Sequence, residues 1–146
     1  MVTIIKSILI DCPLEEVFMF VSKYKNDTIW RKDVIEMLQF PDYSTFVGTT
    51  TIETIKIFGI KHFVSAEVYE YERNKKVSFR TTDAPFTVNG YRDVRREKDK
   101  TKFTYALNAE LKGIYKMFAG FIVYHLRKRI SNDLVRLKQI LEEKKN

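Results

Sequence analysis

Residues 113–126 read GIYKMFAGFIVYHL and begin a predicted helix that continues to about residue 145. The first half of this helix is apolar on nearly every side, whereas a helix that lies on a sheet needs only one apolar stripe. A helix that is apolar all round must be enclosed more completely or must contact a second apolar partner. We therefore expect the function of the protein to involve an apolar molecule held against this helix.

The composition is that of a globular protein. The chain has 146 residues, of which 45% are hydrophobic and 31% are charged, and this length predicts one domain spanning residues 1–146. Residues 1–10 lack the basic start and long apolar run of a signal peptide, and the lone Cys12 can form no internal disulfide. We therefore expect a cytoplasmic protein. The longest apolar stretch, residues 117–126, is too short to span a bilayer.

Hydrophobic periodicity predicts an α+β architecture. A strand over Val2–Ile10 precedes two short helices, of which the first begins at Pro13 and the second ends near Trp30. The pattern then switches to period two. It predicts six further strands, over residues 34–40, 49–57, 61–72, 76–82, 86–97 and 102–110. Because the connections are short, these strands should be antiparallel neighbours. We expect a curved seven-stranded antiparallel sheet wrapped around the long C-terminal helix.

A strongly curved sheet cannot contact a straight helix along its whole length, so a cavity is expected between them. On the last strand Tyr105 and Leu107 should face the helix. On the helix Met117, Phe118 and Ile122 should form the opposite wall. The alternative is that these side chains form an ordinary core without a ligand.

The phase of strand 86–97 is open. If Phe86 and Arg92 face inward, Arg92 is a buried cation that requires an acidic partner. If a bulge at Gly90 shifts the phase, Tyr91 lines the cavity instead. The bulge is the interpretation we favour from the sequence, and all three side chains stay ligand-binding candidates.

Several segments together resemble one superfamily. They are CPLEEVF at 12–18, NDTIWRKDV at 26–34, VGT at 47–49, EVYEY at 67–71 and VSFR at 77–80. Their order and spacing resemble the START-like (SRPBCC) superfamily of polyketide cyclase/dehydrase and lipid-transport proteins, whose fold is called the helix-grip. The resemblance implies a deep apolar cavity for a lipid, polyketide or quinone-like ligand. Trp30 matches the tryptophan of the family's second helix, which implies either a place at the cavity mouth or a packing role.

The sequence contains few candidate catalytic groups. His62 and His125 are the only histidines, and neither has the spacing of a nucleophilic or metal site. The glycines form no phosphate-binding loop, so no cofactor or metal is predicted. The sequence therefore favours a binding or transport protein for a small hydrophobic ligand. The first alternative is a cyclase/dehydratase-type enzyme acting in the same cavity.

The net charge of +7 permits another interpretation. Residues 114–146 hold eight Lys or Arg against three Asp or Glu. This is typical either of a solvated helix face or of contact with an anionic surface. The second alternative is therefore a membrane-surface or protein-interaction module, with transient contact with an anionic membrane. We predict no nucleic-acid partner, and both a monomer and a homodimer stay open.

Overall fold

All seven predicted strands are present in the computed structural model, which describes residues 1–144. Each strand begins and ends within two residues of the predicted position. The strands are β1 (Val2–Ile10), β2 (Val34–Phe40), β3 (Thr50–Ile57), β4 (Ile60–Glu72), β5 (Lys76–Asp83), β6 (Thr87–Glu97) and β7 (Lys100–Glu110). The helical segments are α1 (Leu14–Ser22), the 3-10 helix η1 (Tyr24–Asn26), α2 (Asp27–Trp30), α3 (Ile114–Met117) and α4 (Ala119–Lys144).

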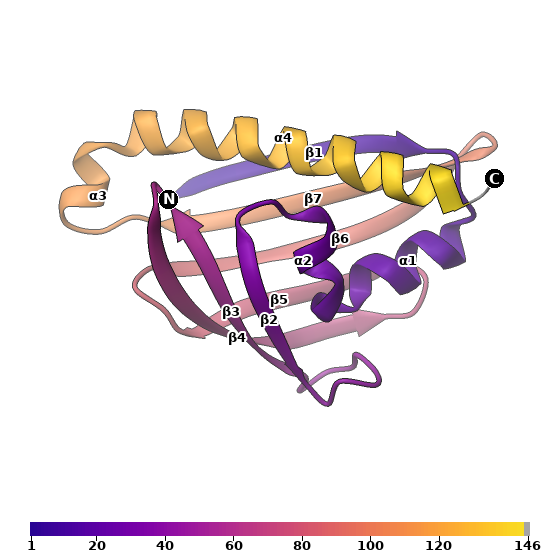
Figure 1. Cartoon of the computed structure of the whole chain (residues 1–146), viewed down its shortest axis with the longest axis horizontal. Helices are drawn as coiled ribbons and strands as arrows, with labels where there is room; N and C mark the ends of the chain where they lie inside the picture. The colour runs from indigo at the N-terminus through magenta and orange to yellow at the C-terminus, as the bar shows by residue number, and fades with distance from the viewer. Residues whose placement is uncertain (145–146) are drawn as a thin grey trace.

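The strands form one antiparallel sheet in the order β1-β7-β6-β5-β4-β3-β2 (Figure 1). Strands β3 to β7 are consecutive neighbours, as expected from their short connections. Strands β1 and β2 follow each other in the sequence but lie at opposite edges of the sheet. The segment between them, which contains α1, η1 and α2, therefore has to cross the molecule. The predicted α+β architecture is confirmed.

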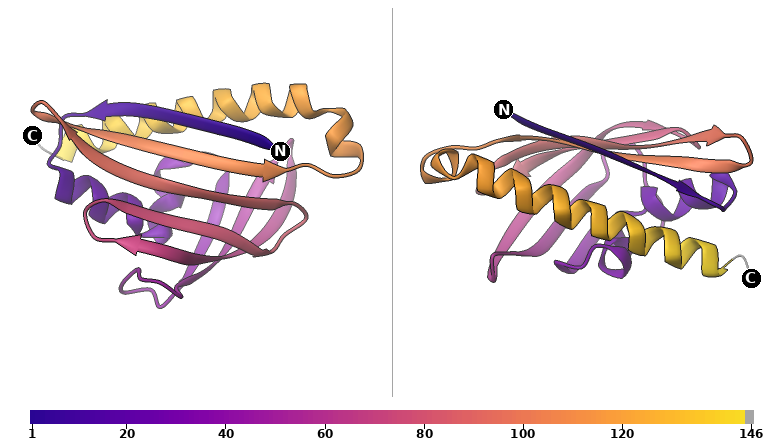
Figure 2. Two further views of the ribbon diagram at one scale, coloured as in Figure 1. Left: turned by 180° about the vertical axis from the view of Figure 1, so that it is seen from behind. Right: turned by 90° about the horizontal axis from the view of Figure 1, so that it is seen from above.

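Helix α4 lies along one face of the curved sheet and crosses it obliquely (Figure 2). From Ile130 onward it contributes four buried apolar side chains, at Ile130, Leu134, Leu137 and Leu141. Their spacing of four, three and four residues places them on one stripe of the helix. They belong to the same core cluster as Phe103 of β7. The segment from Ile130 onward is therefore what holds α4 on the sheet.

The prediction of one continuous helix from residue 113 is wrong at its beginning. Phe118, with φ −103° and ψ 22°, separates the four-residue α3 from α4. The side chains of residues 114–118 are all exposed, so little packing supports a continuous helix here. Gly120, a poor helix former, adds to this weakness. The predicted end near residue 145 lies outside the described residues.

The bulge favoured at Gly90 is also wrong. Strand β6 pairs with β7 in unbroken register from Thr87↔Glu110 to Glu97↔Lys100. Arg92 consequently faces inward and is only 1% exposed. Gly90 has a different role, because a Cβ atom at this position would overlap the backbone oxygen of Ala106. The glycine permits a close approach between the backbones of two neighbouring strands.

Replacing Gly90 with Ala is expected to lower the free energy of unfolding by about 2 kcal/mol or more, since backbone atoms must move to admit the methyl group. Gly120→Ala is the control, because nothing lies within 4 Å of the added methyl group there. That variant should be unchanged or more stable by up to about 1 kcal/mol. Denaturant unfolding of both variants measures the difference. Equal stability of the two variants would contradict the close approach of β6 and β7.

Candidate functional site

A cavity of about 580 Å³ lies between the sheet and α4. Strands β3 to β7 supply about half of the lining residues. The others come from α4, from β2, η1 and α3, and from connecting segments. The apolar wall includes Met37, Ile55, Val64, Ala66, Val68, Phe79, Val88, Ala109 and Leu126. Three further lining residues, Phe58, Ile60 and Tyr115, are about half exposed or more, and they mark the mouth of the cavity. Its volume falls within the range of pockets for small molecules.

Five of the nine side chains predicted to contact a ligand line this cavity. They are Phe86, Arg92, Tyr105, Leu107 and Ile122. Arg92 and Tyr105 face each other from the neighbouring strands β6 and β7, where they are paired in register. Inward-facing positions on β6 and β7, which the alternating sequence pattern had suggested, therefore lie side by side in the cavity wall.

Trp30 and Tyr91 lie elsewhere. Trp30 is completely buried in the core, where its ring makes edge contacts with Phe103 and Tyr105 at centroid distances of 6.1 and 5.9 Å. This arrangement corresponds to the packing role that the sequence left open. Tyr91 lies on the opposite face of β6 from Arg92, with the Lys76 ammonium 4.6 Å from its ring centroid. Because the register contains no bulge, Tyr91 is kept out of the cavity.

Met117 and Phe118 also lie outside the cavity wall. Met117 is 81% exposed and Phe118 is 55% exposed. The sequence assigned them to the wall on the assumption of a continuous, enclosed helix. The break at Phe118 and the exposure of α3 turn both side chains towards solvent instead.

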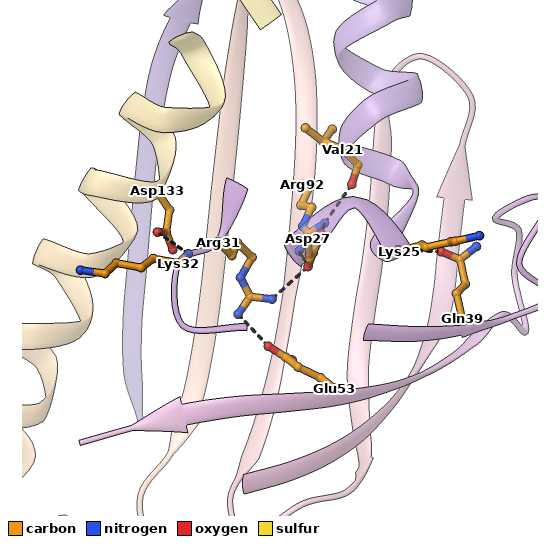
Figure 3. Close-up of polar contacts among 9 residues, drawn as sticks. All are labelled: Val21, Lys25, Asp27, Arg31, Lys32, Gln39, Glu53, Arg92 and Asp133. Atoms are coloured by element: carbon orange, nitrogen blue, oxygen red, sulfur yellow. Dashed lines mark hydrogen bonds and ion pairs between the residues drawn. The ribbon is translucent and has the colours of Figure 1, made fainter. Parts of the chain in front are cut away.

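Four charged side chains form a cluster of ion pairs (Figure 3). Asp27 and Arg92 are buried, Arg31 and Glu53 are partly exposed, and all but Asp27 line the cavity. Arg92 donates from Nη1 to Oδ1 of Asp27 at 2.9 Å and from Nη2 to Oδ2 at 2.6 Å, and it also donates to the backbone oxygen of Val21. Arg31 donates to Oδ2 of the same Asp27 at 2.9 Å and pairs with Glu53 at 3.0 Å. Two cations thus meet two anions, so the cluster carries no net charge.

Aromatic rings cover the guanidinium group of Arg92. Its Cζ atom lies 4.4 Å from the ring centroid of Tyr24, 5.1 Å from that of Tyr105 and 5.2 Å from that of Trp30. Burial acts to lower the pKa of Arg92, but the carboxylate of Asp27 and the hydroxyl groups of Tyr105 and Tyr24 together outweigh this effect, and the pKa is raised. Burial also raises the pKa of the Tyr24 hydroxyl, which stays protonated at neutral pH. Arg92 is therefore permanently charged and held in one position.

Sequence reasoning missed the partner of Arg92. It stated that an inward Arg92 needs an acid, but Asp27 lies 65 residues earlier in the chain. Asp27 is fully buried on the four-residue helix α2. The sequence predicted a short helix here, but a helix of one turn is too short for periodicity to show which of its side chains face inward. The one available signal was that a buried arginine needs a buried carboxylate as its partner. This requirement does not show which of the acidic residues is that partner.

Both histidines line the cavity. The enzyme alternative considers His125 as a proton-transfer group there, whereas nothing in the sequence places His62 in the cavity. The ring of His62 lies 6.3 Å from that of Phe86. His125 packs against Phe121 at 4.3 Å and against Phe58 at 5.9 Å, near the mouth. Within residues 1–144, no group of three His, Cys, Asp or Glu side chains is placed to hold a metal ion.

Comparison with known proteins gives matches only at the level of structure. No protein-family model and no curated protein matches the sequence. The protein TTHA0849 from Thermus thermophilus is 15% identical, with 99% of this chain and 100% of that chain covered and a TM-score of 0.85. A START superfamily protein from Mycobacterium smegmatis is 16% identical, with coverages of 94% and 98% and a TM-score of 0.69. The Zhui aromatase/cyclase from a Streptomyces species is 8% identical, with coverages of 99% and 96% and a TM-score of 0.79.

These matches establish the fold. The chain has the START-like, helix-grip fold, and the resemblance seen in the sequence is confirmed at this level. Identities of 8 to 16% do not transfer an activity, because one fold hosts many functions. In the described part of the chain, no helix combines the length and the hydropathy needed to cross a membrane.

Proposed function

We propose that this protein is a single START-like domain that binds or transports a small hydrophobic ligand in the cavity between the sheet and α4. The observation that carries the proposal is the cavity itself, about 580 Å³ of space between the sheet and the helix. Protein interiors are normally close-packed, and unfilled space costs stability. A cavity of this size is therefore best explained by an occupant.

The chemistry of the wall supports an apolar occupant. Aliphatic and aromatic side chains from β3 to β7 form most of the surface. The charges at the inner wall are already paired with one another, since Asp27 binds both Arg92 and Arg31, and Arg31 also binds Glu53. A charged ligand group at the inner wall would have to displace one of these pairs. A lipid, polyketide or quinone-like molecule with few polar groups fits this environment.

Native mass spectrometry of the purified protein tests the proposal. We expect a mass above that of the chain, and organic extraction after denaturation should release a hydrophobic compound. A protein purified without a ligand should still bind a hydrophobic fluorescent probe. A protein that carries no compound and binds no such probe would contradict the proposal.

The second candidate is an enzyme of the cyclase/dehydratase type. The specific observation in its favour is that His62 and His125 both line the cavity. Histidine exchanges protons near neutral pH and is the most frequent general acid or base in enzymes. Solved structures with the same fold include an aromatase/cyclase, which is compatible with this candidate.

The two candidates differ in the fate of the ligand. After prolonged incubation with the protein, a carrier returns the extracted compound with its mass unchanged. An enzyme should convert it, and His62→Ala should then reduce conversion by about 100-fold while binding persists. We expect an unchanged compound. Conversion that depends on His62 would establish the enzyme instead.

A further inference from the structure

One end of the molecule carries an exposed apolar surface. We define the mouth collar as Phe58 and Ile60 at the β3–β4 turn together with Tyr115, Met117, Phe118 and Phe121 from α3, its end and the start of α4. These six side chains are between 47% and 81% exposed. The rings of Phe58 and Phe121 stack at a centroid distance of 5.5 Å, which joins the two parts of the collar. Contiguous exposed apolar side chains of this size usually mark a contact site.

The mouth collar is continuous with the cavity. Phe58, Ile60 and Tyr115 belong to the collar and also line the cavity. Helix α3 and the start of α4 form one end of the molecule, far from the β6–β7 turn (Figures 1 and 2). A partner bound to the collar would therefore lie directly against the cavity mouth.

The charge around the mouth collar has one sign. Residues 56–66 and 111–132 contain seven Lys or Arg and no Asp or Glu. Six of these basic side chains are exposed, namely Lys56, Lys61, Lys112, Lys116, Arg127 and Lys128. Apolar side chains surrounded by exposed cations are the combination that binds anionic lipid surfaces. A second copy of the chain fits less well, because it would bring the same positive charges together.

We infer that the mouth collar docks onto an anionic phospholipid bilayer. The apolar side chains of the collar enter the headgroup region, and the surrounding lysines contact lipid phosphates. The cavity mouth then faces the membrane. Docking itself does not depend on the proposed ligand-binding function, because it uses the outer surface of the collar.

Flotation with phospholipid vesicles tests the inference. The wild-type protein should float with vesicles containing about 30% phosphatidylglycerol in phosphatidylcholine and should stay unbound with pure phosphatidylcholine, since the attraction is electrostatic. Raising the salt concentration to about 0.5 M should release most of the protein, because salt screens exposed charges. Binding that is equal for both vesicle types, or absent for both, would overturn the inference.

Matched variants locate the contact. Met117→Ser/Phe118→Ser and Lys112→Glu/Lys116→Glu should each lower vesicle affinity by about tenfold or more. The controls are Met19→Ser, an exposed apolar position on α1, and Lys98→Glu/Lys100→Glu at the β6–β7 turn. Both controls should bind as the wild type does. A loss of binding in the controls equal to that in the collar variants would refute the assignment to the collar.

Two further measurements separate the alternatives. Sedimentation without vesicles should give the same mass for the wild type and for Met117→Ser/Phe118→Ser. A dimer that dissociates in this variant would assign the collar to a second copy and overturn the inference. Binding of the hydrophobic probe should persist in Met117→Ser/Phe118→Ser, because neither side chain lines the cavity. Failure of the proposed ligand-binding function is thereby detected separately from failure of docking.

Discussion

Replacing Asp27 with Asn is expected to lower the free energy of unfolding by about 3–5 kcal/mol. The side chains of Asp27 and Arg92 are 0% and 1% exposed, and the two form a bidentate pair. Asn retains the size and one acceptor of Asp but removes the charge. Arg92 then stays buried without its counterion and cannot shed its proton. Denaturant unfolding, followed by two probes to test for a single transition, measures the effect.

The control for this prediction is an exposed ion pair. Glu72 and Lys75 lie 3.6 Å apart with more than half of each side chain exposed. Glu72→Gln should change the free energy of unfolding by about 1 kcal/mol or less, since water screens such pairs. The double variant Asp27→Leu/Arg92→Met should be more stable than Asp27→Asn, because it leaves no unpaired charge at this pair. If Asp27→Asn is as stable as the Glu72 control, Arg92 does not depend on this partner.

Filling the cavity at Ala66 is expected to weaken binding of a hydrophobic probe by tenfold or more, a loss of about 1.4 kcal/mol in binding free energy. Ala66 lies on β4 between Val64 and Val68, and all three side chains line the cavity. The phenyl ring of Ala66→Phe would occupy space that a ligand needs. Titration of the probe into the wild type and the variant measures the change.

The matched control is Ser65→Phe, which places the same ring on the other face of β4. Ser65 is partly exposed and does not line the cavity. Probe affinity should stay at the wild-type value in this variant. The stability of Ala66→Phe adds a second criterion, because insertion into a filled core costs about 1–3 kcal/mol. A destabilised Ala66→Phe that binds the probe normally would show that this part of the cavity is not the binding site.

The membrane inference and the cavity proposal complement each other in one respect. Phe58, Ile60 and Tyr115 contribute to the mouth collar and to the cavity wall, so three residues belong to both surfaces. A ligand taken from a bilayer could enter the cavity without crossing water. The vesicle and probe experiments nevertheless give independent results, because the variants at Met117 and Phe118 alter no residue of the cavity wall.

Local patterns in the sequence were enough to predict the strands, the antiparallel neighbours among β3 to β7 and the inward face of β7. Alternation of apolar and polar residues specifies which side of a strand is buried, and this placed Tyr105 and Leu107 in the cavity wall. Short connections specify that consecutive strands are neighbours. Residue alternation and connection length are both local features of the sequence, so they can be interpreted without the tertiary structure.

The pairing of the charges and the burial of the apolar side chains depend on contacts between elements that are distant in the sequence. The partner of Arg92 is Asp27, which lies far away in the sequence on a helix of one turn. The apolar start of the C-terminal helix was expected to be enclosed, yet Met117 and Phe118 are exposed because the helix breaks there. Hydrophobic periodicity describes a single helix or strand. The partner of a charged side chain and the burial of an apolar one depend on which other elements pack next to it.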